Sequence, residues 1–477
     1  MISVAILVDG QQRELAVLAG SSVRDLIDAA GIELGPLDRS EPPSYTALAE
    51  GDQVRVIRVV EEFEIEQVDL PFVSRTLPNE ALPVGEQRMI QNGTNGLQEV
   101  TYRLMYEDGE LVSRTQVDAV VLSQPVEEII MIVAQSPFSS VEINGKLAFI
   151  SAGNAWVLEG SSGTRSAIAI TGDLDGRILE LSPDGRWLLF SRDSQADDVI
   201  NELWVASLTS AEQELIDLDI ENVVHYAGWT PDGGGIAYST ADLAINPPGW
   251  QANNDLHVLS FDDGDVGDVE TILTPRADGL FAWWGTSFSW SPDGDQLAFA
   301  RPDAVGTVNI GNDSLDVWYT LPDYQTQSHW AWIPGLSWLD DERFYYIRHE
   351  LNPSNFALML AGDEGGAQTI AAEVGMFSNP VAAPDGSQVA FLRAYIPSHS
   401  DISTYELMVA TPEGVSTTLF PPEGAAGMQP QQVAWSPGDG APMIAFTYEG
   451  NLWVVNILSG EALQLTGDGL VSRISWR

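Results

Sequence analysis

The stretch FSWSPDG, residues Phe288–Gly294, decides the fold of most of this chain of 477 residues. A strand-like apolar run enters a Ser-Pro-Asp-Gly turn, in which proline presets φ and glycine takes the positive φ. Variants recur at intervals of 44 to 61 residues, each followed by an apolar run such as QLAFA and then a second such as DVWYTL. The other copies are LELSPDG (Leu179–Gly185), AGWTPDG (Ala227–Gly233), LSWLDDE (Leu336–Glu342), VAAPDG (Val381–Gly386) and VAWSPGDG (Val433–Gly440).

Units of four short strands at this period are typical of β-propeller blades. The six complete copies alone indicate six blades. However, Lys146–Thr171 matches strands two to four of a unit and lacks a first strand, whereas Ser472–Arg477 is a first strand with nothing after it. The two fragments complete each other. The sequence therefore predicts a mainly β chain with a seven-bladed propeller over 143–477, closed by the C-terminal strand, which leaves no open sheet edge. Six blades is the alternative.

Across 143–477 these repeats resemble the TolB-like, WD-type (WD40-like) propeller family. The resemblance implies a surface that recognises a protein partner. Tryptophan usage marks the same boundary, because all 15 tryptophans lie at or after Trp156.

The first 59 residues predict a small β-grasp domain. Ile2–Val8 and Glu14–Leu18 form a predicted hairpin around an Asp-Gly turn. Ser21 or Ser22 can cap a helix with apolar residues at helical spacing, and this helix stops at Gly31. The segments VRDLIDAAGIELGPLD and LAEGDQVRVIR resemble the ubiquitin-like repeat of resuscitation-promoting factors and related bacterial wall proteins.

Residues 60–142 predict a β-ribbon domain with a linker, because EVTYRLMY and ELVSRTQVDAVVL alternate as two-faced strands around an Asp-Gly turn. The segment resembles the five-glycine (G5) surface domain that often follows the ubiquitin-like repeat. Four of its glycines fall at Gly85, Gly93, Gly96 and Gly109, and Ala134 stands at the fifth position. The resemblance implies association with the cell surface or with glycan, and no reaction. A plain linker ribbon is the alternative.

The chain is strongly acidic, with 69 Asp+Glu against 21 Lys+Arg and a formal net charge of -48. Nucleic acid and anionic lipid both require a basic footprint, so neither is an expected partner. The absence of cysteine excludes disulfides and thiol chemistry. No apolar run approaches the roughly 18 residues of a spanning helix. Met1–Gly10 lacks the basic start of a signal peptide. We expect an extracellular or envelope-associated protein whose export signal is absent from this chain.

No reaction signature is present: the chain has no H-E-x-x-H, G-x-S-x-G or Walker motif. The sequence therefore predicts no enzyme, no cofactor and no metal site. The Asp-rich turns Gly172–Gly176 and Asp262–Asp268 lack the closing Glu of a calcium-binding EF-hand loop. His225 and His257 fall within predicted strands and are interpreted as core or strand-face residues.

The long loops predict a binding face. In a four-stranded meander, the loops after the second and the fourth strands share one face, and the long insertions all fall there. Large aromatic side chains in loops are costly to expose unless they pack together or bind a ligand. Replacing Trp283 and Trp284 by Ala is expected to abolish binding and to leave the fold intact. A small core above the blades is the alternative. The candidate ligand-binding residues are Trp250, Trp283, Trp284, His329, Trp330, Trp332, His349 and His399.

The sequence thus predicts a non-catalytic binding or scaffold protein of the bacterial cell envelope, whose propeller face recognises cell-wall glycan. One alternative is an accessory propeller that binds a peptide or protein partner. Another is a propeller enzyme such as a glycan hydrolase, which requires two carboxylates about 5–9 Å apart beside the central channel.

Overall fold

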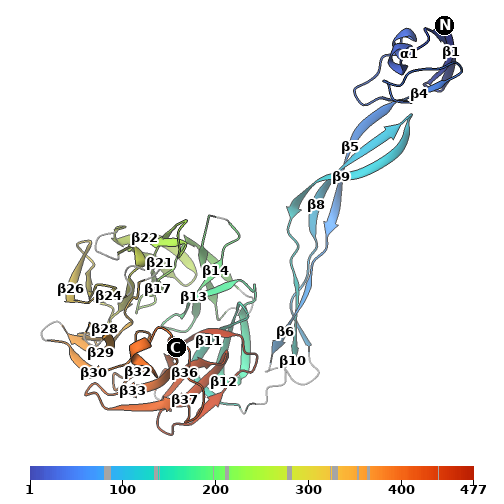
Figure 1. The fold of residues 1–477 in the computed structure, drawn as a ribbon. Coiled ribbons are helices and arrows are strands. Elements are labelled where there is room, and N and C mark those ends of the chain that lie inside the picture. The colour runs from blue at the N-terminus through green and yellow to red at the C-terminus, as the bar shows by residue number, and fades with distance from the viewer. Residues whose placement is uncertain are drawn as a thin grey trace. The chain divides into compact units, whose positions relative to one another are not determined.

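The computed structural model describes residues 1–79, 87–133, 138, 140–196, 198–209, 214–276, 282–322, 324, 331–351, 354–362, 366–438 and 440–477. The chain divides into two compact units, Met1–Ala134 and Gln135–Arg477. Strands dominate both units (Figure 1), which confirms the mainly β prediction. The helices of the described ranges are α1 (Val23–Ala29) and the 3-10 turns η1 (Ala282–Trp284) and η2 (Pro397–His399), all too short to cross a bilayer.

The first unit begins with the predicted β-grasp. Its sheet has the order β2-β1-β4-β3, and β1 pairs antiparallel with β2 and parallel with β4. Ser22 caps α1, since its hydroxyl accepts from the backbone N–H of Asp25 while the Asp25 carboxylate accepts from Ser22. The apolar face of α1 is buried against β1 and β4. The strands are β1 (Ile2–Val8), β2 (Gln11–Val17), β3 (Arg39–Glu41) and β4 (Gln53–Ile57).

A ribbon of long strands follows, as predicted. One sheet has the order β5-β8-β9 and a second the order β6-β10-β7. Gly96 is required where the ribbon narrows, because a Cβ there would lie 2.4 Å from the Ser123 carbonyl oxygen. Gly85 and Ala134 lie outside the described residues. The strands are β5 (Val59–Leu70), β6 (Ser74–Asn79), β7 (Gln87–Gln91), β8 (Gly96–Glu107), β9 (Glu110–Ser123) and β10 (Glu128–Val133).

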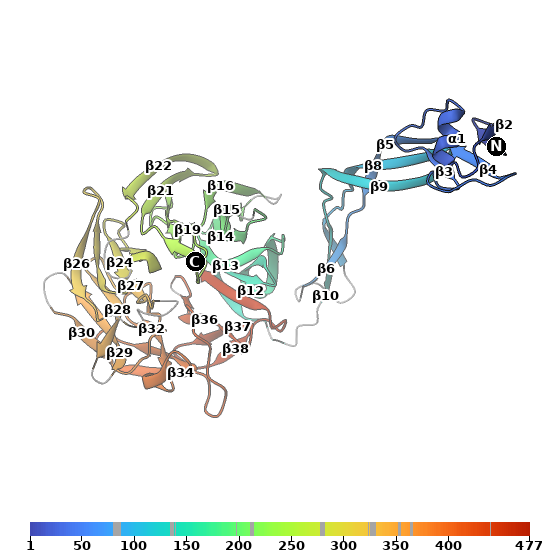
Figure 2. The same ribbon diagram turned by 45° about the horizontal axis from the view of Figure 1, so that its top comes forward.

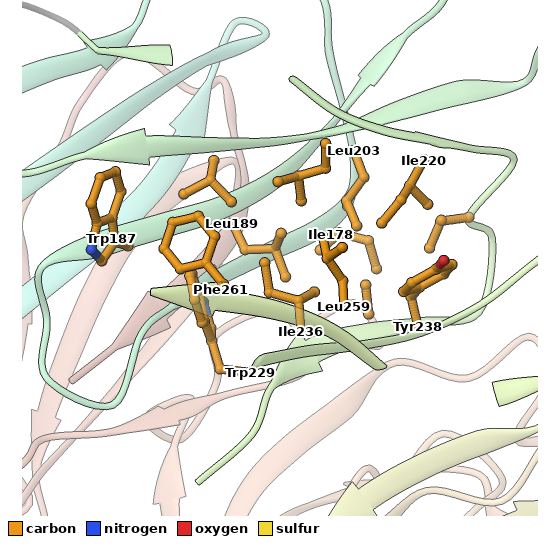
Figure 3. Close-up of a cluster of buried hydrophobic side chains, with 14 residues drawn as sticks. Ile178, Trp187, Leu189, Leu203, Ile220, Trp229, Ile236, Tyr238, Leu259 and Phe261 are labelled. Carbon is orange, nitrogen blue, oxygen red and sulfur yellow. The ribbon is translucent and has the colours of Figure 1, made fainter. Parts of the chain in front are cut away.

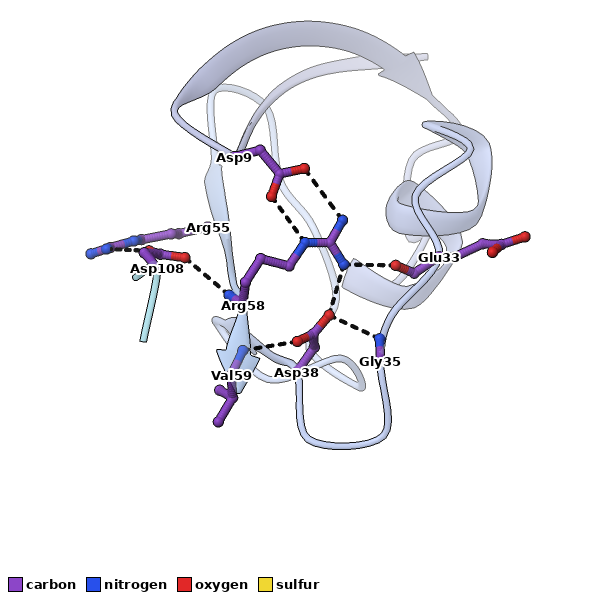
Figure 4. A network of polar contacts seen from close by, with 8 residues as sticks. All are labelled: Asp9, Glu33, Gly35, Asp38, Arg55, Arg58, Val59 and Asp108. Atoms are coloured by element: carbon purple, nitrogen blue, oxygen red, sulfur yellow. Dashed lines mark hydrogen bonds and ion pairs between the residues drawn. The ribbon is translucent and has the colours of Figure 1, made fainter. Parts of the chain in front are cut away.

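Arg58 ties the β-grasp to the first ribbon strand (Figure 4). Its guanidinium donates to Asp9 at 3.0 Å and to Asp38 at 2.7 Å, and its backbone N–H donates to Asp108 at 3.0 Å. Burial alone would raise the pKa of Asp38, but hydrogen bonds from Val59 and Arg58 outweigh it and hold that pKa below its usual value. The junction is therefore held by three carboxylates that accept hydrogen bonds from one arginine.

The second unit is a ring of antiparallel sheets, which Figure 2 shows around a common centre. First strands of neighbouring sheets contact each other, as β13 does with β17 and β27 does with β31, so these strands line the axis. In the described residues six sheets have four strands, and β19 (Ala241–Leu243) and β20 (Trp250–Ala252) form a separate hairpin. The six sheets are β13 (Leu174–Leu181), β14 (Trp187–Asp193), β15 (Asn201–Ser207), β16 (Leu215–Glu221); β17 (Tyr226–Trp229), β18 (Gly235–Ser239), β21 (Leu256–Asp262), β22 (Asp265–Leu273); β23 (Ser287–Trp290), β24 (Leu297–Arg301), β25 (Ala304–Asn309), β26 (Ser314–Thr320); β27 (Leu336–Trp338), β28 (Arg343–Leu351), β29 (Ser354–Gly362), β30 (Gln368–Ala371); β31 (Val381–Ala382), β32 (Val389–Ala394), β33 (Tyr405–Ala410), β34 (Ser416–Phe420); and β35 (Ala434–Trp435), β36 (Met443–Tyr448), β37 (Asn451–Asn456), β38 (Ala462–Gln464).

A further sheet contains both ends of this unit. It has the order β12-β11-β39, formed by β11 (Glu142–Ser151), β12 (Asn154–Ala169) and β39 (Val471–Trp476). β39 pairs antiparallel with β11 from Leu147↔Trp476 to Ser151↔Val471. The last described strand is thus the first strand of the sheet that opens the ring, and the pairing closes the circle.

Packing between neighbouring sheets explains the continuous apolar runs. In β14, Leu188 and Phe190 face the β12-β11-β39 sheet, while Trp187 and Leu189 face the next sheet. Figure 3 shows the latter contact, where Trp187 meets Phe261 edge-to-face at 5.1 Å. A strand buried on both faces needs apolar residues at every position rather than at alternate ones.

The Ser-Pro-Asp-Gly turns share one geometry. The Gly185 N–H donates to the Ser182 carbonyl at 2.9 Å, and Gly185 has a φ of +67°. The Ser182 hydroxyl donates to Asp184 at 2.6 Å. The same pairs recur at the same 2.6 Å for Thr230 with Asp232 and for Ser291 with Asp293. An ionised Asp therefore organises each of these turns.

Candidate functional site

Three predicted site residues come together with His225. Trp250 of β20 meets Trp284 of η1 edge-to-face at 6.3 Å, and Trp283 lies over Trp284 at 3.9 Å with 32° between the rings. The His225 ring meets Trp250 at 4.6 Å. Trp284 is only 2% exposed, whereas Trp250 and Trp283 are half-buried. These four residues form the aromatic cluster.

Gly285 allows the His225 ring to pack closely within the aromatic cluster. It has a φ of +122°, and a Cβ there would lie 2.4 Å from Nε2 of His225. Burial, with the nearby Arg177 charge, lowers the pKa of His225 to about 4. The imidazole is therefore neutral at pH 7, and its ring packs against the backbone of Gly285. The prediction that His225 lies within a strand is wrong, because the residue precedes β17 (Tyr226–Trp229). Its contact with Gly285 joins segments 60 residues apart, so no local pattern in the sequence indicates it.

Trp332 and His349 lie elsewhere. Both contact Phe356, with ring centroids 4.9 Å and 5.0 Å away, and they are 3% and 4% exposed. The Trp332 indole donates to the Met376 carbonyl at 2.7 Å. The chain after β26 thus folds over the core between two sheets. These side chains have a packing role, and their rings are not open to a ligand.

His399 ends η2 in the loop between β32 and β33 and is exposed. Its Nδ1 lies 3.0 Å from the Ser398 hydroxyl, and the neighbouring Ile396 and Ile402 are exposed too. His329 and Trp330 fall in a segment that the structure does not describe.

The inner wall of the ring holds a carboxylate that the sequence search missed. In AGWTPDG, in FSWSPDG and in β39, the residue just before the tryptophan is small, namely Gly228, Ser289 or Ser475. At the same position of the repeat, LELSPDG carries Glu180. A Cβ on Gly228 would lie 2.7 Å from Oε2 of Glu180, so the small residue makes room for the carboxylate. Arg477 lies 3.8 Å from its Oε1. Aligning the copies by register would have singled out Glu180.

Burial raises the pKa of Glu180 to about 7, although the positive charges of Arg477 and Arg473 act to lower it. Burial also lowers the pKa of Arg473, while the charges of Glu180 and Asp175 act in the other direction. Such a carboxyl can exchange a proton near neutral pH. Within the described ranges, no group of three or more His, Asp or Glu side chains is arranged to hold a metal ion.

A β-grasp, a ribbon of long strands and a ring of sheets define a modular, mainly β protein. Comparison with known families specifies the modules: residues 61–132 match the G5 domain, and residues 4–43 match the G5-linked ubiquitin-like domain. The chain therefore carries both, as its sequence predicts. It is similar to resuscitation-promoting factor RpfB of Mycolicibacterium smegmatis, at 27% identity over 161 residues that cover 32% of this chain and 44% of the relative. The match thus spans less than half of that relative.

Two solved structures align with parts of the chain. A structure of prolyl endopeptidases aligns with a TM-score of 0.47 and 16% identity, over 70% of this chain and 49% of that one. The G5 domain of HP0197 aligns with a TM-score of 0.15 and 18% identity, over 16% of this chain and 96% of that one. Likeness at this level carries no information about an activity.

Proposed function

We propose that this chain is a non-catalytic binding protein of the bacterial cell envelope, and that the aromatic cluster of its propeller recognises cell-wall glycan. The G5 and ubiquitin-like domains support an envelope-associated binding role. The RpfB similarity supports the same location. The propeller supplies a rigid platform for a ligand.

The contact of Trp283 with Trp284 carries the proposal. Trp284 is immobilised by burial, and the tilted Trp283 ring packs against it with 3.9 Å between the ring centroids, while part of the Trp283 ring stays accessible. A fixed, half-exposed indole offers an apolar face at little entropic cost. Leu243, paired with Trp250, and the nearby Ile245 are exposed and extend the apolar surface. A few anchored rings beside polar backbone are the usual content of a recognition site.

The test is a titration of purified peptidoglycan fragments, followed by tryptophan fluorescence. Trp283→Ala is expected to weaken binding at least tenfold and to leave the melting temperature nearly unchanged. Replacing Trp284 as well would destabilise the protein, because its indole is buried, so the single change is the informative one. Trp318→Ala, on the outer strand β26, is the matched control and should retain binding.

The exposed Ile245 and Leu243 favour a second candidate, a peptide partner that binds the same apolar surface. Binding of peptides but not of glycan fragments, lost in Trp283→Ala, would select this candidate. Glycan binding that survives in Trp283→Ala would exclude the aromatic cluster as the site.

A further inference from the structure

Four polar side chains lie along one stretch of the inner wall of the ring. They come from the first strands of neighbouring sheets, which contact each other from β39 to β13 and from β13 to β17. On β39, Arg473 shares a face with Ser475, whose hydroxyl accepts from the Leu181 N–H of β13 at 3.0 Å. Rings of β17 and β23 meet at 5.4 Å, so the row continues to β23. The inner-wall cluster comprises Arg473 of β39, Glu180 of β13, Tyr226 of β17 and Trp290 of β23.

Gly228 brings Glu180 and Tyr226 together. A Cβ on this glycine would lie 2.7 Å from Oε2 of Glu180 and 3.5 Å from the Tyr226 hydroxyl oxygen. The carboxyl and the phenol therefore occupy the space that a side chain would take. The Glu180 side chain is 32% exposed, and the other three members of the cluster are partly exposed, so solvent reaches it.

Trp290 lacks the hydrogen bond that its counterparts in three other sheets make. Each counterpart donates to a carbonyl of the neighbouring first strand: Trp229 to Glu180 at 3.2 Å, Trp338 to Ser289 at 2.8 Å and Trp435 to Val381 at 2.8 Å. The Trp290 Nε1 is buried and has no partner among the described residues. Burial and the Glu180 charge raise the pKa of the Tyr226 phenol, while the nearby Trp290 indole acts against both. The phenol oxygen can thus accept from the indole, which leaves the phenol proton to be donated to a ligand.

Arg473 supplies a cation that is not bonded to a carboxylate. Burial lowers its pKa, while the charges of Glu180 and Asp175 act to raise it. Within the part of the chain that the structure describes, its guanidinium forms neither a hydrogen bond nor an ion pair. Asp175 is engaged elsewhere, since it accepts from the Asn201 side chain at 2.8 Å and from the Arg177 N–H at 2.9 Å. An enclosed guanidinium with free donors favours an anionic partner.

We propose that the inner-wall cluster binds one small monocarboxylate, whose oxygens accept hydrogen bonds from Arg473, Tyr226 and the protonated carboxyl of Glu180. The ligand supplies the negative charge that Arg473 lacks, and its two coplanar oxygens suit a guanidinium. The net charge of -48 repels a polyanion. A single carboxylate therefore fits better than a polymer of acidic groups.

Binding should be coupled to the proton on Glu180. The charged groups that face this carboxyl are Arg473 and Arg477 of β39, and the Tyr226 phenol faces it from β17. Burial raises the pKa of Glu180 to about 7. A neutral carboxyl donates to the ligand, whereas an ionised one would repel it. The affinity should therefore be about tenfold lower at pH 8 than at pH 6, since the protonated fraction falls by that factor.

The probe is acetate, with acetamide as the matched neutral probe, measured by calorimetry on the full chain at pH 6 and pH 8 in buffers free of carboxylates. We expect acetate to bind at least tenfold more tightly than acetamide at pH 6, because charge-assisted hydrogen bonds exceed neutral ones. Arg473→Gln should weaken acetate binding at least tenfold at pH 6. Glu180→Gln keeps a neutral donor, so it should bind acetate equally at both pH values. Arg343→Gln, at an exposed arginine paired with Asp340, is the matched control and should change nothing.

Absence of acetate binding at pH 6, or equal binding of acetate and acetamide, overturns the proposal. So does a pH dependence that persists in Glu180→Gln, or acetate binding that survives in Arg473→Gln. Melting temperatures show whether both variants are folded, and the pH comparison with Glu180→Gln decides if Arg473→Gln is not. Phosphate binding as tight as acetate binding would indicate a general anion site and also contradict the proposal. Trp283→Ala should leave acetate binding intact, so this result is independent of the glycan proposal.

Discussion

At the scale of single residues, two glycines in neighbouring loops distinguish the stability cost of backbone strain from that of close side-chain packing. Gly285 and Gly249 have φ values of +122° and +95°, but only Gly285 has close neighbours, because a Cβ there would meet His225. We expect Gly285→Ala to lower the free energy of unfolding by about 2–4 kcal/mol, from strain and overpacking together. Gly249→Ala should lower it by about 1–2 kcal/mol, from strain alone. Urea denaturation of both variants measures the difference. Equal losses would show that the His225 contact contributes nothing.

Glu180 gives the ring a pH dependence whose sign is fixed by its environment. Its pKa is raised to about 7 in the folded protein, from roughly 4.3 in an unfolded chain. Between these values the folded state keeps a proton that the unfolded state releases. The stabilising contribution is therefore complete below about pH 4.3 and is lost as the pH rises through 7. We expect Glu180→Gln to gain stability relative to the parent between pH 5 and pH 8, in denaturation series at each pH.

The control for that series is Glu159→Gln, which removes an exposed carboxylate from the neighbouring sheet. It retains Glu180 and should follow the parent curve. A Glu180→Gln curve parallel to the parent across this pH range would contradict the raised pKa.

Among strands and loops, β39 is the element on which closure depends. Trp476 is buried, and its indole donates to the Asn144 carbonyl at 2.6 Å. We expect Trp476→Ala to lower the free energy of unfolding by about 3–5 kcal/mol. Deleting Ser472–Arg477 should destabilise the chain further, because the inner strand of a sheet is lost. Leu470→Ala, at an exposed position just before β39, should stay within about 0.5 kcal/mol of the parent. A deletion variant that melts with the parent would show that closure adds no stability.

Strands and loops also differ in how far the sequence predicts them. Runs such as Trp187–Phe190 are apolar at every position because both faces are buried, and the Pro-Asp-Gly turns recur, so sheets and their order follow from the repeat. Loop packing has no period. Trp283 and Trp332 look equivalent in sequence, yet one is half-exposed and the other donates to Met376 in a core. For Trp332 the hydrogen-bond partner lies 44 residues further along the chain. Glu180 was missed because its significance lies in its contacts with Gly228 and Arg477.

For the chain as a whole, charge is the property that limits its partners. The formal net charge is -48, and most of the 21 basic residues form ion pairs in the described part of the structure. Arg58 with Asp38 and Arg192 with Asp173 are examples, at 2.7 Å and 2.8 Å. A guanidinium that is already paired with a carboxylate contributes little to a positive surface potential.

This distribution predicts that the protein binds neither nucleic acid nor anionic membranes. Binding to DNA draws on the release of counterions from several phosphates by adjacent Lys and Arg residues. Here the surrounding carboxylates repel the phosphates over a Debye length of about 8 Å at physiological salt. We expect no retention on a DNA column and no co-sedimentation with phosphatidylserine vesicles at 0.15 M salt. Lowering the salt should strengthen the exclusion, because repulsion is then less screened, whereas a genuine basic site would bind more tightly. Retention that increases as salt decreases would therefore reveal a positive surface and overturn this prediction.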